Sequence, residues 1–272
     1  MHCKICNNPS EKIFEKTILQ KYLTGYYKCV SCAFVQTDDP IWLSEAYESA
    51  ITSLDIGLLS RNLYLQYEIS NILDNVFPDA KIMLDYAGGY GVLVRIMRDA
   101  GYNFYREDLY CENIFARHFD IADSKTTKFD IVTAFEVLEH FSNPLLQIEN
   151  VFKFADVAIF STVLTPKTNL EIENWWYISQ ETGQHIAFYT TAAMNFIAKK
   201  FNRKYYCKNG NLHIFINNEL KDEKTHKAMQ NLLKKRYFFG LLKKRITKKN
   251  VKKESLLQQD YQLIKNLLNT KP

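Results

Sequence analysis

The stretch Asp85–Gly91, with the sequence DYAGGYG, decides the fold class expected for this chain of 272 residues. It holds three of the nine glycines of the chain, between the apolar run KIMLDY (81–86) and the helical pattern GVLVRIMRDAG (91–101). Glycines at a strand-to-helix turn let the backbone turn sharply and approach a ligand without a Cβ in the way. The helix that follows points its N-terminal amides and the positive end of its dipole into that space. The stretch therefore predicts a ligand-binding turn after a buried strand.

Strand and helix patterns alternate beyond this turn. Strands are expected at YNFYRED (102–108), FDIVTAFE (129–136) and ADVAIFST (155–162). Helices are expected at NPLLQIENVFKF (143–154), with Pro144 in its first turn, and at TTAAMNFIAKKF (190–201), capped by Thr190 or Thr191. Asn209-Gly210 separates two strand-like runs in RKYYCKNGNLHIFIN (203–217), which predicts a hairpin. The expected fold class is α/β, with a mostly parallel Rossmann-like sheet whose last strand is reversed in that hairpin.

An acidic residue, Glu107 or Asp108, ends the strand after the glycine-rich turn. Asp108 lies 23 residues beyond Asp85, the usual distance for a carboxylate that receives the two ribose hydroxyls of a nucleoside. A nicotinamide dinucleotide and S-adenosylmethionine both fit this geometry. The dinucleotide fingerprint requires G-x-G-x-x-G, and AGGYG (87–91) lacks that spacing. The terminal hairpin also favours S-adenosylmethionine.

Four of the six cysteines form two pairs, Cys3-x-x-Cys6 and Cys29-x-x-Cys32. Two such pairs can place four thiolates tetrahedrally around one zinc ion. A segment of about 40 residues has too small a core to fold alone, so the metal would supply folding free energy. A closed site of four thiolates leaves no open position, which predicts a structural zinc. The alternatives are free buried thiols, or His2 in place of one cysteine.

These motifs resemble those of the class I S-adenosylmethionine-dependent methyltransferases. Asp85, Gly89 and Gly91 match the first motif of that family, D-x-G-x-G-x-G, in which Ala87 replaces one glycine. FDIVTAFEVLEHFSNP (129–144) resembles the fourth strand and the following turn of its small-molecule branch. The resemblance covers about residues 80–217 and predicts a methyltransferase that uses S-adenosylmethionine.

The resemblance also implies a role for individual residues. Residues 87–91 would lie against the methionine part of the donor, Asp108 would hold the ribose, and Leu109 would flank the adenine. Glu139 and His140 would lie near the floor of the pocket, or form a hydrogen-bonded pair that shapes the turn. The implied donor-binding residues are Asp85, Ala87, Gly88, Gly89, Gly91, Asp108, Leu109, and Phe135 and Glu136 beside the sulfonium.

The four-cysteine segment followed by this domain resembles a bacterial subgroup that modifies sugars on nucleotides or surface polysaccharides. One branch methylates a sugar carbon and carries a Tyr-x-Glu-His pattern after the fifth strand. The matching segment is ETGQHIAFYT (181–190), where His185 aligns with the histidine. Thr182 and Gln184 stand in place of the tyrosine and the glutamate. A sugar hydroxyl is therefore the first acceptor expected, and a sugar carbon is the alternative.

Transfer to a hydroxyl needs a base, and histidine has a suitable pKa. His185, on a long loop after the fifth strand, is the expected base, and its alternative role is to anchor that loop. His140 is the reserve candidate. Trp175, Trp176 and Tyr177 on the same loop could stack on the acceptor sugar, close over it as a lid, or pack against the sheet edge.

A basic segment follows the hairpin, with 12 Lys or Arg and no Asp or Glu from residue 224 to 253. It could contact an anionic membrane surface, a lipid-linked or nucleotide-linked acceptor, or RNA, or be a solvated helix face. ESLLQQDYQLIKNLL (254–268) predicts an amphipathic helix packed on the domain. Its expected inward residues are Leu256, Leu257, Tyr261, Ile264 and Leu267.

Four parts are expected: a zinc-binding module (1–39), a helical connector (40–78), the S-adenosylmethionine-binding domain (79–218) and a basic helical extension (219–272). With no apolar run of about 18 residues and no apolar core near the N-terminus, a cytoplasmic protein is expected. An RNA methyltransferase and a non-catalytic binding module that keeps the fold are the competing functions. Nucleic acid is not the expected partner, because no Asn-Pro-Pro-Tyr tetrad and no paired catalytic cysteines occur.

Overall fold

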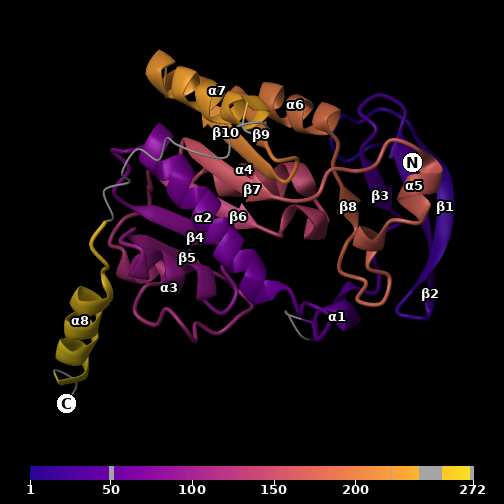
Figure 1. The fold of residues 1–272 in the computed structure, drawn as a ribbon. Coiled ribbons are helices and arrows are strands. Elements are labelled where there is room, and N and C mark those ends of the chain that lie inside the picture. The colour runs from indigo at the N-terminus through magenta and orange to yellow at the C-terminus, as the bar shows by residue number, and fades with distance from the viewer. Residues whose placement is uncertain (49–51, 221, 239–252, 270–272) are drawn as a thin grey trace. The chain divides into compact units, whose positions relative to one another are not determined.

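The computed structural model describes residues 1–48, 52–220, 222–238 and 253–269 (Figure 1). The chain divides into two compact units. The first unit joins residues 1–55 to 133–219, and the second joins residues 56–132 to 220–272. The described strands form one sheet of six strands and one of four.

The six-stranded sheet has the strand order β5-β4-β6-β7-β10-β9. Its strands are β4 (Met83–Tyr86), β5 (Phe104–Glu107), β6 (Ile131–Phe135), β7 (Val157–Ser161), β9 (Arg203–Lys208) and β10 (Leu212–Asn217). β4 and β5 run parallel, whereas β10 runs antiparallel to β7 and β9. Asn209 and Gly210, between β9 and β10, have left-handed φ angles of 62° and 78°, a conformation that these two residue types adopt most readily. The expected mostly parallel α/β sheet with a reversed last strand is confirmed.

The helices agree with the local signals in the sequence. The helices of the first unit are α1 (Leu43–Ala46), α4 (Pro144–Phe152), α5 (Asn169–Glu173) and α6 (Thr191–Lys200), with the 3₁₀ turns η2 (Leu138–His140) and η3 (Trp176–Ile178). The second unit has α2 (Leu58–Val76), α3 (Val92–Asp99), α7 (Glu223–Phe238), α8 (Leu257–Asn269) and η1 (Ile121–Asp123), and η4 (Asn218–Leu220) crosses the division. Thr190 caps α6, because its hydroxyl accepts a hydrogen bond from the amide of Ala193. Pro144 begins α4, as expected.

The four-stranded sheet joins the N-terminal segment to the long loop between β7 and α6. Its order is β1-β2-β3-β8, with β1 (Ser10–Ile18), β2 (Tyr22–Cys29), β3 (Val35–Thr37) and β8 (Ala187–Phe188) (Figure 1). Val35 of β3 pairs with Phe188 of β8. Buried side chains from both segments, among them Tyr26, Trp42 and Ile178, share one core cluster. The cysteine segment therefore packs against this loop, while the division into four parts stays a prediction.

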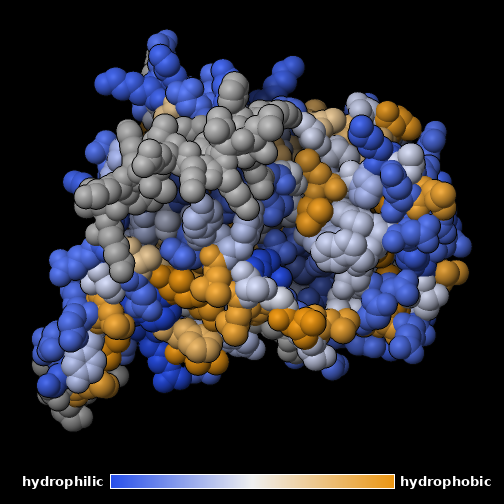
Figure 2. All heavy atoms as spheres, viewed as in Figure 1, coloured by the Kyte–Doolittle hydropathy of each residue, from blue (hydrophilic) through white to orange (hydrophobic). Residues whose placement is uncertain are grey.

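Helix α8 contacts α3 through a buried charged residue, whereas most of the large apolar side chains of α8 are exposed. Leu257, Tyr261 and Leu267, expected to face inward, are 55%, 56% and 40% exposed, and Figure 2 shows hydrophobic side chains on the visible surface of α8. Asp260 is buried instead and forms ion pairs with Arg95 and Arg98 of α3. The inward prediction was wrong for these three residues because a pair of arginines on α3 sets the orientation of α8.

Residues 239–252, nearly half of the basic segment, lie outside the described residues, so the contacts considered for this segment stay predictions. Within the described ranges, no helix has both the length and the apolar character needed to cross a membrane.

Candidate active site

The glycine-rich turn after β4 is built from left-handed residues. Ala87, Gly89 and Gly91 have φ angles of 55°, 55° and 85°. A Cβ on Gly91 would lie 2.8 Å from Oδ1 of Asn113 and 3.0 Å from Cβ of Ala116, so both conformation and space require glycine at this helix start. Ala87 adopts the same backbone conformation without being glycine, which costs on the order of 1 kcal/mol.

Gly88 packs where no side chain would fit. A Cβ there would lie 2.8 Å from Oδ2 of Asp85 and 2.9 Å from Cγ of Arg106. Asp85 itself is buried at the end of β4. The close packing around Gly88 holds the turn against the end of β5.

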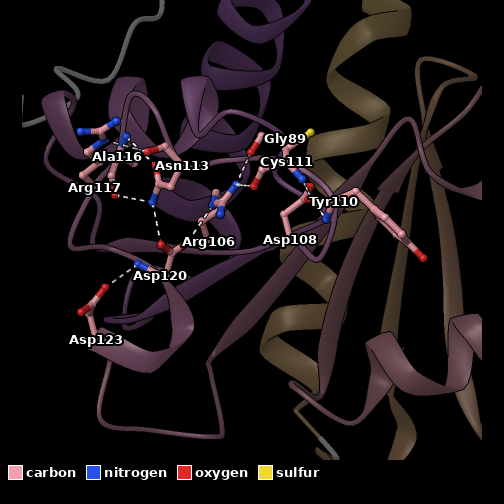
Figure 3. A network of polar contacts seen from close by, with 10 residues as sticks. All are labelled: Gly89, Arg106, Asp108, Tyr110, Cys111, Asn113, Ala116, Arg117, Asp120 and Asp123. Atoms are coloured by element: carbon pink, nitrogen blue, oxygen red, sulfur yellow. Dashed lines mark hydrogen bonds and ion pairs between the residues drawn. The ribbon is translucent and has the colours of Figure 1, made fainter. Parts of the chain in front are cut away.

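Asp108 organises two loops of the second unit. Its Oδ2 accepts a hydrogen bond from the amide of Gly89 at 2.9 Å, and its Oδ1 accepts from the amides of Tyr110 and Cys111, both at 2.8 Å (Figure 3). The carboxylate of Glu107, one residue earlier, makes no hydrogen bond with the described residues, and its pKa is raised by burial and by the charge of Asp108. The two candidate ribose acceptors therefore differ: Asp108 is engaged by backbone amides, whereas Glu107 is not.

Arg106 holds the glycine-rich turn and the loop after β5 together, a role that the sequence did not predict. The guanidinium is buried in β5 and donates hydrogen bonds to the carbonyl oxygens of Gly89 and Cys111 and to Oδ1 of Asp120 (Figure 3). Asp120 also accepts from the side-chain amide of Asn113. The sequence did contain a signal for this role, because a charged residue in a strand that is expected to be buried needs polar partners.

Leu109, expected to flank the adenine, is 79% exposed, and Tyr110 beside it is 88% exposed. Both side chains thus belong to the free surface of the loop that Asp108 holds.

In the first unit, Phe135 ends β6 and Glu136 turns the chain into η2. Glu136 has a left-handed φ of 53°. Its amide donates to the hydroxyl of Ser161 on β7, and that hydroxyl donates in turn to the Glu136 carboxylate at 2.5 Å. This reciprocal pair fixes the direction in which the chain leaves the sheet.

Glu139 is fully buried in η2. Its Oε1 accepts a hydrogen bond from the hydroxyl of Tyr177 at 2.5 Å, while no hydrogen-bond partner of Oε2 occurs among the described residues. Burial and the adjacent Glu139 carboxylate raise the pKa of Tyr177 well above its ordinary value. A buried carboxylate oxygen without a partner is costly and calls for an explanation.

His140 and His185, the two expected catalytic residues, lie side by side with ring centroids 5.0 Å apart. Nδ1 of His185 is 2.6 Å from the carbonyl oxygen of Tyr177. Nδ1 of His140 is 3.0 Å from the carbonyl oxygen of Gln184 and 2.9 Å from the hydroxyl of Tyr47. The pKa of His140 is lowered to about 3, first by burial and then by the charge of His185, so this ring is neutral near pH 7.

The aromatic residues of the loop differ in their exposure. Tyr177 is buried and Trp176 is 75% exposed. Trp175 packs on Tyr177 and Phe188. Trp175 and Trp176 also line a cavity of about 250 Å³, together with the charged residues Lys16, Glu173 and Glu181.

The four cysteines of the N-terminal segment converge. Sγ of Cys6 lies 3.4 Å from that of Cys29 and 3.5 Å from that of Cys32, and the Cys3 and Cys32 sulfurs are 3.6 Å apart. Four thiolates around a zinc ion at about 2.3 Å are separated by roughly 3.8 Å, so this group fits the metal. The imidazole of His2 is hydrogen-bonded to the carbonyl oxygen of Asn7 and is not part of the group.

Comparison with known proteins identifies one family. A family described as a methyltransferase domain matches residues 61–207. No protein of curated function matches the chain.

Solved structures with similarity to the chain are remote in sequence. Magnesium protoporphyrin IX methyltransferase from Synechocystis PCC 6803, with bound S-adenosylmethionine, is 14% identical over 66% of this chain and 97% of its own, with a TM-score of 0.41. TnmH is 12% identical over 65% of this chain and 61% of its own, with a TM-score of 0.46. The plantazolicin methyltransferase BpumL, in complex with S-adenosylhomocysteine, is 10% identical over 66% and 95%, with a TM-score of 0.44.

Proposed function

The chain belongs to the class I S-adenosylmethionine-dependent methyltransferases, and from this premise we propose that it methylates a hydroxyl oxygen of a sugar or nucleotide sugar. S-adenosylmethionine is the methyl donor. The observation that carries the choice of an oxygen acceptor is the pair of adjacent imidazoles, His140 and His185. The four cysteines would hold a structural zinc ion.

The second unit would bind the donor. The turn 87–91 offers backbone amides at the start of α3, and the acidic end of β5 offers carboxylates. Both oxygens of Asp108 already accept hydrogen bonds from backbone amides. We therefore propose that Asp108 holds the loop, and that one of its remaining lone pairs accepts a hydrogen bond from a ribose hydroxyl. Glu107, whose carboxylate makes no hydrogen bond within the described ranges, would receive the other ribose hydroxyl.

The histidine pair would activate the acceptor. In the transfer, a bond forms between the acceptor oxygen and the methyl carbon, the bond between that carbon and the sulfonium breaks, and the hydroxyl proton must leave. The carbonyl oxygen near Nδ1 of each ring can only accept a hydrogen bond, so we assign the ring proton to Nδ1 and the lone pair to Nε2. His185, with His140 beside it, would draw off the acceptor proton while the protein holds the hydroxyl in line with the sulfonium.

Two contacts favour oxygen over carbon as the acceptor atom. Gln184 stands where the carbon-methylating branch has a glutamate, and its side chain donates to the carbonyl oxygen of Ala46. Thr182 stands where that branch has a tyrosine, and its hydroxyl donates to the carbonyl oxygen of Ser179. Both positions therefore serve the structure of the loop and supply no acid or base.

The cavity beside Trp175 and Trp176 supports a sugar as the acceptor. Aromatic faces pack on the apolar faces of sugar rings, and carboxylates accept hydrogen bonds from their hydroxyls. The exposed ring of Trp176 and the carboxylates of Glu173 and Glu181 provide both.

The first test is calorimetric titration with S-adenosylhomocysteine, with NADH as the control ligand. We expect micromolar binding of the first ligand and none of the second. Methyl transfer from ¹³C-methyl-labelled donor to a panel of nucleotide sugars then identifies the acceptor atom by NMR. An O-methyl signal is expected, and a methyl group on a ring carbon would refute the proposal. The His185→Ala variant should bind donor normally and lose turnover, whereas His226→Ala, on α7, should behave like the wild type.

A further inference from the structure

Three residues of the first unit offer metal ligands in one place. Glu139, His140 and His185 each provide a ligand atom, and these atoms lie within 4.8 Å of one another. The three come from two segments, η2 and the loop before β8, which are joined by a hydrogen bond from the amide of Ile186 to the carbonyl oxygen of Glu139 at 2.8 Å.

Both imidazoles are prepared as ligands. Metal-binding histidines almost always donate their second ring N–H to a carbonyl or a carboxylate, which fixes the tautomer and the orientation of the ring. His140 and His185 each place Nδ1 on a backbone carbonyl, of Gln184 and Tyr177 respectively. In the tautomer assigned above, the lone pair of each ring is on Nε2. The hydroxyl of Tyr47, 2.9 Å from Nδ1 of His140, adds a further support.

Glu139 supplies the negatively charged ligand that the two imidazoles do not provide. Its Oε1 is held by the hydroxyl of Tyr177, while its buried Oε2 lacks a hydrogen-bond partner among the described residues. A cation at this oxygen would satisfy it. Tyr177 then has two supporting roles, since its hydroxyl orients Glu139 and its carbonyl oxygen orients His185.

We infer that Glu139, His140 and His185 bind a divalent transition-metal ion. Two imidazoles and one carboxylate are a ligand set suited to such ions, and three protein ligands leave a position open for another oxygen. The inference rests on the proposed function in one respect: the acceptor hydroxyl would take that open position. A metal-bound hydroxyl loses its proton to water more readily, so with the ion bound the two histidines would activate the acceptor as ligands of the ion and no longer as bases.

The test separates this site from the four cysteines by the choice of ion. Thiolates select zinc, whereas manganese prefers sites with carboxylate oxygen, which the cysteine group lacks. Protein loaded with one equivalent of zinc per chain, which the four thiolates take up first, is titrated with Mn²⁺, and bound ion is measured by calorimetry and by electron paramagnetic resonance. We expect one Mn²⁺ per chain in the wild type. Glu139→Gln and His185→Ala should each weaken binding at least tenfold, because each removes one of three ligands, and His226→Ala should leave it unchanged.

Total zinc gives a second measurement that does not depend on Glu139→Gln folding. After equilibration with zinc and gel filtration, the wild type should carry two ions per chain and His185→Ala one. Equal zinc content in both, or equal Mn²⁺ affinity in wild type and variants, would overturn the site.

The outcomes also separate this site from the proposed function. Binding of S-adenosylhomocysteine without Mn²⁺ binding would remove the metal site and keep the methyltransferase. Mn²⁺ binding without methyl transfer to any sugar would keep the site and refute the acceptor.

Discussion

Replacement of Asp260 by asparagine should release helix α8 from α3. Oδ1 of Asp260 accepts a hydrogen bond from Nη2 of Arg98 at 2.7 Å, and its Oδ2 accepts from Nε of Arg98 and Nη2 of Arg95, both at 2.8 Å. Asp260 and Arg98 are 2% and 4% exposed. Removal of one partner from a buried ion pair costs about 3–5 kcal/mol, because the other charge stays buried and unpaired.

The loss should appear first as local opening of α8. Most of its large apolar side chains are exposed, so the ion pair and the segment before the helix, where the amide of Leu256 donates to the carbonyl oxygen of Arg98, are its main attachments. A loss of about 3 kcal/mol corresponds to a factor of roughly 150 in the opening equilibrium. Hydrogen exchange measured by mass spectrometry on peptides from 257–269 should show protection reduced by about two orders of magnitude in Asp260→Asn.

Gln259→Ala is the matched control, because Gln259 is exposed on the same helix. It should change exchange in α8 by a factor of two or less. Unchanged protection of α8 in Asp260→Asn would show that other contacts hold the helix and would refute the reasoning.

Four further outcomes are expected. Asp108→Ala removes the acceptor of three backbone amides and should lower affinity for S-adenosylhomocysteine at least tenfold while the far-ultraviolet circular dichroism is retained; unchanged affinity would contradict the loop assignment. Gly91→Ala forces a side chain into a left-handed position and should destabilise the protein by about 1–3 kcal/mol in urea denaturation, which a wild-type midpoint would refute. Burial lowers the pKa of His213 to about 4, so the unfolded state binds the proton more readily. The free energy of unfolding should therefore fall by about 3 kcal/mol as the pH drops from 6.5 to 4. The same fall in the His213→Gln variant would show that His213 is not its cause. A strong chelator should make the four clustered cysteines reactive to alkylation in mass spectrometry, and their full reactivity before chelation would argue against bound zinc.

The parts of the fold that follow from nearby residues could be predicted from the sequence. The run 81–101 contains its strand, its glycines and its helix in order, and Asn209-Gly210 specifies its own turn. Pro144 and Thr190 mark helix starts through the chemistry of one residue. Such features need no information from distant parts of the chain.

Features that depend on distant partners could not be predicted. β3 and β8 have three and two residues, too few for a periodic pattern, and they pair across about 150 positions. The apolar spacing in α8 predicts one inward face, but Asp260 has its partners on α3. Nothing in the sequence placed Tyr177 against Glu139, and this contact turns two separate motifs into one cluster.

The pairing of β3 with β8 would link the two ligand-binding events that we propose for the first unit. The hydroxyl of Thr190 donates to the carbonyl oxygen of Cys32 at 2.6 Å, so the loop that carries His185 is fastened directly to the cysteine cluster. Release of a zinc ion from the four cysteines would loosen this loop and weaken binding of the acceptor. Because coupling free energies are reciprocal, a bound acceptor would tighten the hold on the metal by the same factor. If the four cysteines hold zinc as proposed, the cysteine segment would stabilise the bound conformation of the acceptor loop, and zinc supply would set the fraction of molecules competent for catalysis.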